Sequence, residues 1–289
     1  MHTHAAVSAL RSGSHAPPAA PAMQRARGTV RIAVAAAGGG SARLVESYQS
    51  GAARVRYPRP RAGAPLEAVL VNTAGGLTGG DRLDHAVTVG AGARAVVTTQ
   101  AAERIYRRAD GIARIDTRLT VAAGASLAWL PQETILFDRS ALTRTLAADI
   151  DPAARLIAVE ALVLGRAAMG ETAERIQLAD SWRIRRGGRL VFADGARLDG
   201  DAADVMAGGA TGRGAVALAT VVLVAPDAGA CLDRARAALA DGRGEGGASA
   251  WNGILVGRLL APSGQVLRAD LVRLIEALAG APMPRVWQC

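Results

Sequence analysis

The chain of 289 residues contains no lysine, and this absence removes several classes of enzyme. A P-loop NTPase needs a lysine that reaches the β- and γ-phosphates, and a Schiff-base enzyme needs a lysine amine. P-loop hydrolysis and pyridoxal phosphate or aldolase-type chemistry are therefore excluded. Arginine supplies all 34 basic residues, and the formal net charge is +9. This charge indicates an acidic partner, a polyanion, or simply an arginine-rich composition.

Aromatic residues are scarce, with four Trp, three Tyr and two Phe in the whole chain. Proteins that bind single-stranded nucleic acid stack the bases on aromatic side chains placed among basic ones. The arginine clusters at residues 54–61 and 183–189 have only Tyr57 and Trp182 in or beside them. We therefore predict no nucleic-acid partner.

Cysteine and histidine are too few for most metal or nucleophilic sites. Cys231 and Cys289 are far apart and form no CxxC pair, so the sequence encodes neither a disulfide framework nor a zinc knuckle. Only His85 lies outside the N-terminal 28 residues, and no GxSxG motif is present to supply a nucleophilic serine. We expect no catalytic residues and a location in the reducing cytoplasm.

Long hydrophobic runs are absent as well. Residues 1–28 are rich in Ala, Ser, Pro and His without the apolar core of a signal peptide, and we interpret them as a disordered tail. The longest apolar run, residues 215–225, covers about half of the roughly 20 residues that a membrane helix needs. We predict that this run is a buried strand and that the protein does not bind a membrane.

Short β-type segments separated by glycines are abundant from Val30 to Val224. Residues 88–93 align on residues 120–125, and the same offset places Gln100 on Gln132. A period of about 30 residues in a β-rich chain is typical of stacked coils or hairpins. The prediction is a single, mainly β domain over residues 29–289. Its architecture is an elongated β-helix-like or stacked-hairpin one with a few helices, mostly C-terminal.

Two helices are expected near the C-terminus. Residues 228–240 form the first, and a glycine-rich run ends it. Residues 265–279 form the second, with Ser263 as N-cap and Gly280 as the stop. Its leucines repeat at helical spacing and indicate a face that packs on the core.

The densest glycine segment is NTAGGLTGGD, residues 72–81, which follows a short apolar strand. Four glycines allow sharp turns and close backbone approach. The segment is not a phosphate-binding loop, because it lacks the GxGxxG spacing and ends in an acid that would repel phosphate. It presents Asp81 and Asp84 beside His85, or it is a purely structural turn with solvated acids.

Carboxylates recur near the ends of the β segments and are the remaining candidates for chemistry. Oxygen ligands without thiolates or several imidazoles hold a divalent ion weakly, which suits passage and not storage. The alternative is a set of ordinary salt bridges with Arg104, Arg107, Arg144 and Arg166. The candidates are Asp81, Asp84, Glu103, Glu133, Asp138, Glu160 and Glu171.

Five segments in this order resemble the signature segments of the UreD (UreH) family of urease accessory proteins. Arg104 stands where the family usually has lysine, which conserves the charge. The resemblance covers roughly residues 29–289. The segments are NTAGGLTGGD (72–81), TTQAAERIYR (98–107), WLPQETILFD (129–138), EALVLGRAAMGE (160–171) and PRVW (284–287).

The resemblance implies a chaperone without enzymatic activity that docks on apo-urease and binds UreF, and through UreF the nickel-carrying GTPase UreG. It implies a dimer of heterodimers with UreF, a long β-rich fold, and nickel in transit through an internal passage, without a tightly bound cofactor. The alternative is a basic β-rich binding module or an enzyme unrelated to urease.

Individual residues receive expected roles from this resemblance. Four acids, Asp81, Asp84, Glu133 and Glu171, are expected to line the nickel passage. The other matched residues are expected to bind partners or to support the fold: Gly75, Gly76, Gly79, Gly80, Gln100, Arg104, Tyr106 and Arg166.

Overall fold

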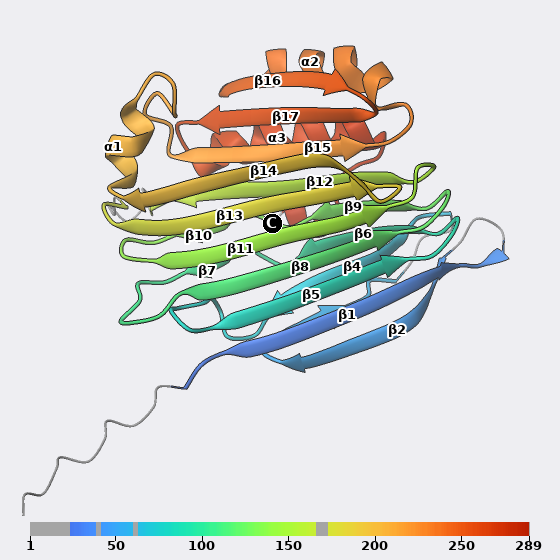
Figure 1. Ribbon diagram of the computed structural model, residues 1–289, viewed down its shortest axis with the longest axis horizontal. Helices are drawn as coiled ribbons and strands as arrows, with labels where there is room; N and C mark the ends of the chain where they lie inside the picture. Colours follow the sequence, from blue (N-terminus) through green and yellow to red (C-terminus); the bar gives the residue numbers. More distant parts are fainter. Residues whose placement is uncertain (1–23, 39–41, 60–62, 166–172, 289) are drawn as a thin grey trace, which may run out of the picture.

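The computed structural model describes residues 24–38, 42–59, 63–165 and 173–288, and within them two β-sheets pack face to face (Figure 1). Sheet A has seven strands and sheet B has ten. In spatial order, sheet A contains β14 (Arg189–Gly200), β13 (Ile176–Arg186), β11 (Ala141–Ile150), β8 (Ala113–Val121), β5 (Arg82–Val89), β1 (Arg27–Ala36) and β2 (Ala42–Gly51).

Sheet B has one main path and two short strands beside it. The short strands, β7 (Glu103–Ile105) and β10 (Thr134–Leu136), pair with each other, and β10 also pairs with β12. In spatial order the main path contains β16 (Glu245–Trp251), β17 (Ile254–Ala261), β15 (Ala217–Val224), β12 (Arg155–Leu164), β9 (Ser126–Leu130), β6 (Arg94–Thr99), β4 (Leu66–Asn72) and β3 (Ala53–Arg56).

The central part of the chain winds in successive coils. It alternates between the sheets from β4 to β13, and strands of consecutive coils pair in parallel. In sheet A, β5 pairs with β8 and β8 with β11; in sheet B, β6 pairs with β9 and β9 with β12. Thr88 pairs with Thr120, which is the register that the sequence repeat indicated. The predicted mainly β, solenoid-like fold is therefore confirmed. The described residues begin inside the segment interpreted as a tail, and β1 already starts at Arg27.

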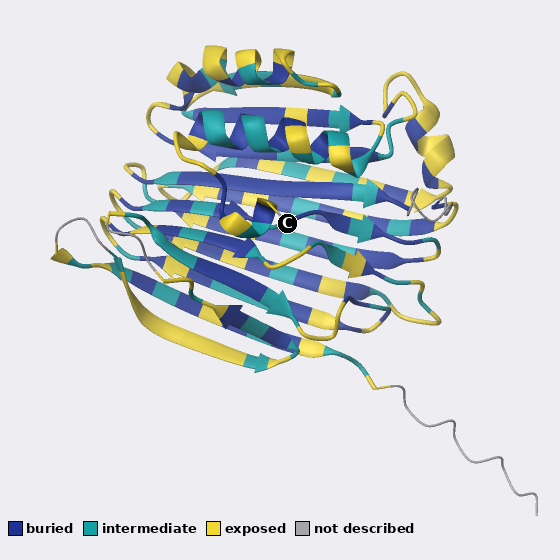
Figure 2. Ribbon diagram, turned by 180° about the vertical axis from the view of Figure 1, so that it is seen from behind, coloured by how far each residue is buried: buried dark blue, intermediate teal, exposed yellow. Residues whose placement is uncertain are grey.

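Alternation of apolar and polar residues explains the two-sheet packing. In β8 every second residue is buried, so one face of the strand contacts the core between the sheets and the other faces solvent. β12 is buried on both faces because helices cover the outer side of sheet B. β2 is exposed along nearly its whole length at the edge of sheet A (Figure 2).

The helices lie mainly at the C-terminal end. The helix α3 (Gly264–Ala279) starts with Ser263 accepting a hydrogen bond from the Val266 backbone and ends at Gly280, which has a φ of 64°. This confirms the predicted cap and stop. Among the described helices, none has both the length and the apolar character that a membrane crossing requires.

Within the described residues, the other four helical elements with given bounds are short. The element α1 carries an N-cap, Asp201, that the sequence analysis did not single out. Buried Cys231, which ends the turn before α2, is a free thiol. These elements are α1 (Ala202–Ala207), η3 (Ala228–Cys231), α2 (Leu232–Ala240) and η4 (Arg285–Gln288).

Candidate functional site

Four of the signature segments stack at one edge of the coil. Leu77 bridges to Ile105 in parallel, Ile105 pairs with Leu136 in the β7–β10 ladder, and Leu136 pairs with Leu164. All four side chains are buried. Each of these four segments therefore supplies one rung of a single apolar stack, which explains physically why they recur at regular intervals.

The glycine segment lies against the second signature segment. Leu77 donates its backbone N–H to the Arg104 carbonyl at 2.7 Å, and the Tyr106 hydroxyl donates to the Gly75 carbonyl at 3.0 Å. A side chain at Gly76 would collide with the Tyr106 ring, and one at Gly79 would collide with the backbone of Asp110. Gly76 and Gly79 therefore permit two backbone segments to approach each other closely, which favours the structural interpretation of this turn.

Asp81 closes the same turn. Its side chain is 5% exposed, and its two oxygens accept the backbone N–H groups of Ala26 at 2.7 Å and Thr78 at 2.8 Å. Gly80 has a φ of 87° and lies against the Arg25 side chain. Both carboxylate oxygens are thus used to hold the start of β1 against the glycine segment.

The other acids predicted to line a passage lie in separate places. Asp84 is on the outer face of sheet A, where Arg82 binds it at 2.8 Å. Glu133 accepts a hydrogen bond from Arg268 of α3 at 2.6 Å, on the helix-covered side of sheet B. Glu171 and Arg166 lie outside the described residues. The structure does not bring Asp81, Asp84 and Glu133 together.

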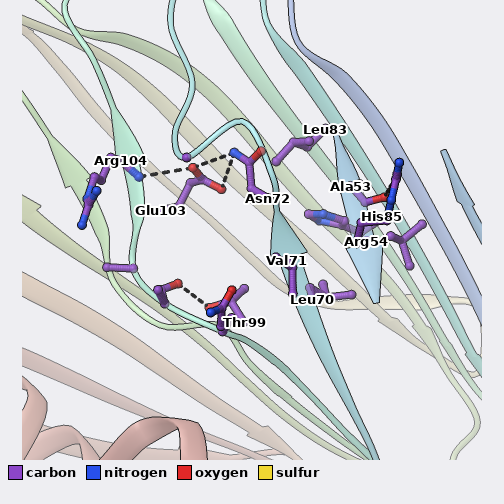
Figure 3. A pocket seen from close by; sticks show the side chains of 15 residues that line it. Ala53, Arg54, Leu70, Val71, Asn72, Leu83, His85, Thr99, Glu103 and Arg104 are labelled. Atoms are coloured by element: carbon purple, nitrogen blue, oxygen red, sulfur yellow. Dashed lines mark hydrogen bonds between the residues drawn. The ribbon is translucent and has the colours of Figure 1, made fainter. Parts of the chain in front are cut away.

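A cavity of about 200 Å³ opens between the sheets near β3, β4 and β7. Its lining includes Asn72, His85, Gln100, Glu103 and Arg104, of which three belong to the second signature segment. Figure 3 shows that His85 and Glu103 approach this cavity from opposite sides. The cavity therefore brings polar groups to the edge of the core between the sheets.

His85 points inward from β5 into this core. Its ring lies 5.9 Å from the Trp129 ring, and its Nδ1 has no hydrogen-bond partner among the described residues. Burial lowers the pKa of His85 to about 4, although the neighbouring Asp84 charge opposes this shift. The imidazole is therefore neutral at pH 7 and retains a lone pair that can bind a metal ion.

Glu103 faces the same cavity. The Asn72 side-chain amide donates to its two oxygens at 3.0 and 3.2 Å, and the Arg104 backbone donates at 3.2 Å. Burial raises the pKa of Glu103 to about 7, against the opposing effect of these hydrogen bonds. Glu103 can thus exchange its proton for a cation near neutral pH.

A charged triad lies deeper between the sheets. Arg144 of β11 forms ion pairs with Glu160 of β12 and, at 2.7 Å, with Asp180 of β13. All three side chains are less than 10% exposed. Burial raises the pKa of Glu160, and Arg144 opposes the shift while Asp180 reinforces it. One guanidinium cannot neutralise two carboxylates, so the triad favours an additional cation or proton.

Glu103 and Glu160 are among the carboxylates expected from the sequence, whereas Asp180 is not. A detectable signal exists for Glu160, because it interrupts a buried apolar strand between Val159 and Ala161. Asp180 has a comparable signal, because it stands between the buried Leu178 and Trp182 in the alternation of β13. The packing of the two sheets then shows which cation it faces, Arg144 of β11.

Across the described ranges, no three His, Cys, Asp or Glu side chains gather closely enough to hold a metal ion. The interior instead offers separate ligand groups: Glu103 and His85 at the cavity, and the carboxylates of the triad. Such an arrangement can give a cation successive weak contacts.

Comparison with known proteins identifies the family. The family model described as UreD urease accessory protein matches residues 26–288. Urease accessory protein UreD 2 of Methylorubrum populi is 50% identical over 281 residues, covering 95% of this chain and 94% of the relative. The UreD proteins of a Methylobacterium species (48% over 280 residues, 95% and 99%) and of Rhizobium leguminosarum bv. trifolii (51% over 265 residues, 91% and 96%) are similar.

These matches span nearly all of the described residues and agree with the stacked signature segments. They leave no place for the alternative of a binding module or an enzyme unrelated to urease. The chain belongs to the UreD family of urease accessory proteins, which act in urease maturation.

Proposed function

We propose that this protein is a cytoplasmic nickel-insertion chaperone, not an enzyme, which docks on apo-urease. Together with UreF and UreG, it delivers nickel to the urease active site. Nickel is its cargo and not a resident cofactor. The observation that carries the proposal is the line of polar groups between the two sheets, from the cavity at Glu103 and His85 to the triad around Arg144.

Buried polar groups lower the stability of a core unless they have hydrogen-bond or charge partners. Leaving a buried hydrogen-bonding group without a partner costs about 1–3 kcal/mol. His85 carries such an unpartnered nitrogen, and the triad carries an unbalanced negative charge, within the described core. A cation that passes these groups would satisfy them temporarily.

The donors suit a cargo that must leave again. Thiolates or several imidazoles would hold nickel tightly, whereas one imidazole and isolated carboxylates bind it weakly. Cys231 is buried in the helix-covered cluster on the other side of sheet B, away from the core between the sheets. The route that we propose therefore uses His85, Glu103, Glu160 and Asp180 in place of Asp81, Asp84 and Glu133.

Exposed apolar side chains support a protein partner. Leu44, Val45 and Tyr48 of β2 are between 36% and 56% exposed at the edge of sheet A, and Trp251 of β16 is 44% exposed at the opposite edge of sheet B. Apolar residues on exposed strands are typical of surfaces that a partner covers. We expect UreF to form a complex with this chain, with UreG attached through UreF, as a dimer of heterodimers.

Co-expression with a urease operon that lacks its own UreD tests the proposal. Glu103→Gln and Glu160→Gln keep the side-chain shape and remove the charge, so nickel content and urease activity should fall while the complex still assembles. Asp149→Asn is the matched control, because Asp149 is an exposed acid of β11, the strand that carries Arg144. Equal nickel content in all three variants would contradict the interior route.

A further inference from the structure

A second hollow, of about 310 Å³, lies where three strands of sheet A begin. Arg108 precedes β8, Arg139 precedes β11 and Arg175 precedes β13, and all three line the hollow. Adjacent strands lie about 4.8 Å apart, so the segments that lead into them run side by side. Consecutive coils thus bring three arginines around one space.

Backbone hydrogen bonds hold these segments together. Arg108 donates its N–H to the Arg139 carbonyl at 3.0 Å, and Gln177 donates to the Ser140 carbonyl at 3.0 Å. The Arg175 N–H donates to Asp138 at 2.9 Å. The backbone that carries the three arginines is therefore held in place, although their side chains reach solvent.

The charges around the hollow are unbalanced. Three arginines and one acid, Asp199, line the hollow, and Asp199 lies 3.7 Å from Arg197. The Arg108 guanidinium also donates to the Gly111 carbonyl at 3.0 Å. Asp138, which is not a lining residue, lies 3.4 Å from the Arg139 side chain. Each guanidinium presents its N–H donors in a fork that fits an oxyanion, and the hollow is lined by more arginines than carboxylates.

Ser140 supplies a second observation. Its side chain is 1% exposed, it lines the hollow, and its hydroxyl finds no hydrogen-bond partner within the described chain. Buried hydroxyls are nearly always hydrogen-bonded, so an unpaired one in a residue that lines a hollow indicates a missing partner. An oxyanion would accept this hydrogen bond.

The backbone of Arg139 supplies a third observation. Its φ is 58°, in the left-handed region that non-glycine residues seldom adopt. Such strain costs free energy and clusters at sites where a side chain must take a particular direction. The turn therefore has an arginine at a backbone conformation that glycine adopts at lower free energy.

We propose that Arg108, Arg139, Arg175 and the Ser140 hydroxyl form a binding site for a single oxyanion group of the carboxylate or phosphate type. The three arginines donate charge-assisted hydrogen bonds and the serine donates a neutral one. The site is separate from the interior polar line, and the inference does not depend on the proposed nickel route.

Calorimetric titration of the purified full chain with inorganic phosphate, at constant ionic strength, tests the site. The wild type should bind one phosphate saturably. Arg139→Gly should weaken binding at least about tenfold, because it removes one charge-assisted hydrogen bond. It should leave the melting temperature unchanged or higher, because glycine accepts the backbone conformation. Arg175→Gln tests the same site without a backbone change.

Arg213→Gly is the matched control. Arg213 is another exposed arginine with a left-handed φ, 50°, but it pairs with Glu245 far along the chain and lines neither hollow. Phosphate binding that weakens in Arg139→Gly and Arg175→Gln but not in Arg213→Gly supports a site for a free oxyanion.

The oxyanion could also be a partner's carboxylate, and the same variants distinguish this source. If phosphate does not bind, but Arg139→Gly and Arg175→Gln weaken co-purification with UreF and apo-urease while Arg213→Gly does not, the partner supplies the group. Equal phosphate binding by all variants would overturn the inference. So would the absence of both phosphate binding and any effect on assembly.

Discussion

Glu133 and Arg268 lie 135 residues apart in the sequence, yet a carboxylate oxygen and a guanidinium nitrogen of the pair are 2.6 Å apart. Arg268 also donates to Gln132 at 2.7 Å and to the Trp287 carbonyl at 3.2 Å. Trp287 is buried, and its indole N–H donates to Thr98 at 3.0 Å. The third signature segment therefore fastens helix α3 and the C-terminal PRVW segment to sheet B.

This pair predicts a structural effect of Glu133 substitution. Glu133→Ala should lower the free energy of unfolding by about 1–3 kcal/mol, because Arg268 loses a buried charged partner. Glu133→Gln should cost less, since it keeps one acceptor. Urea denaturation with tryptophan fluorescence measures both. A loss of nickel from urease without a loss of stability would instead support the expected role of Glu133 in the nickel passage.

The glycines of the 72–81 segment should differ in their tolerance of alanine. Gly75 has a φ of 75° and open space around it, so Gly75→Ala should cost only about 1 kcal/mol. At Gly79 a Cβ atom would collide with the Asp110 carbonyl, so Gly79→Ala should cost about 3 kcal/mol or more. Denaturation midpoints decide this, and equal values would contradict the close approach.

His85 predicts an acid-sensitive stability. Its folded pKa of about 4 is below the ordinary 6.5, so the unfolded chain binds the proton first. The contribution of neutral His85 to the free energy of unfolding is complete above pH 6.5. It is lost as the pH falls towards 4, with a magnitude of about 3 kcal/mol. His85→Phe should flatten this part of the curve of unfolding free energy against pH. An unchanged slope would show that the pKa of His85 is the same in the folded and the unfolded chain.

Glu103 predicts the opposite dependence. Its folded pKa of about 7 is above the ordinary 4.5, so the folded chain binds the proton first and loses stability as the pH rises from 4.5 to 7. Glu103→Gln should therefore gain stability relative to the wild type above pH 7, on the order of 1–3 kcal/mol. The difference between the two proteins should disappear near pH 4. A constant difference across this range would contradict the raised pKa.

The triad allows a test that separates folding from transport. Arg144→Met leaves Glu160 and Asp180 without their cation and should lower the free energy of unfolding by about 3–5 kcal/mol. Replacing all three by apolar residues of similar volume should restore most of this stability. Nickel content of co-expressed urease should nevertheless stay low in the triple variant. Wild-type nickel content would exclude the triad from the route.

The sequence by itself determined the architecture. The repeat that aligned residues 88–93 on 120–125 is the register of adjacent coils, because each coil must present the same buried pattern to the next. The cap at Ser263 and the stop at Gly280 bound α3 because their local hydrogen bonds and backbone angles need no distant partner. The glycines of residues 72–81 indicated a close approach, although not the segment approached.

The tertiary structure decided which charged residues face one another. Glu160 and Asp180 meet at Arg144 only because β11, β12 and β13 come together from two sheets, whereas Asp81 and Glu133 are engaged by the backbone and by α3. Arg108, Arg139 and Arg175 converge because each precedes a neighbouring strand. Spacing along the chain reports which residues share a strand face, but the environment of that face depends on the element packed against it.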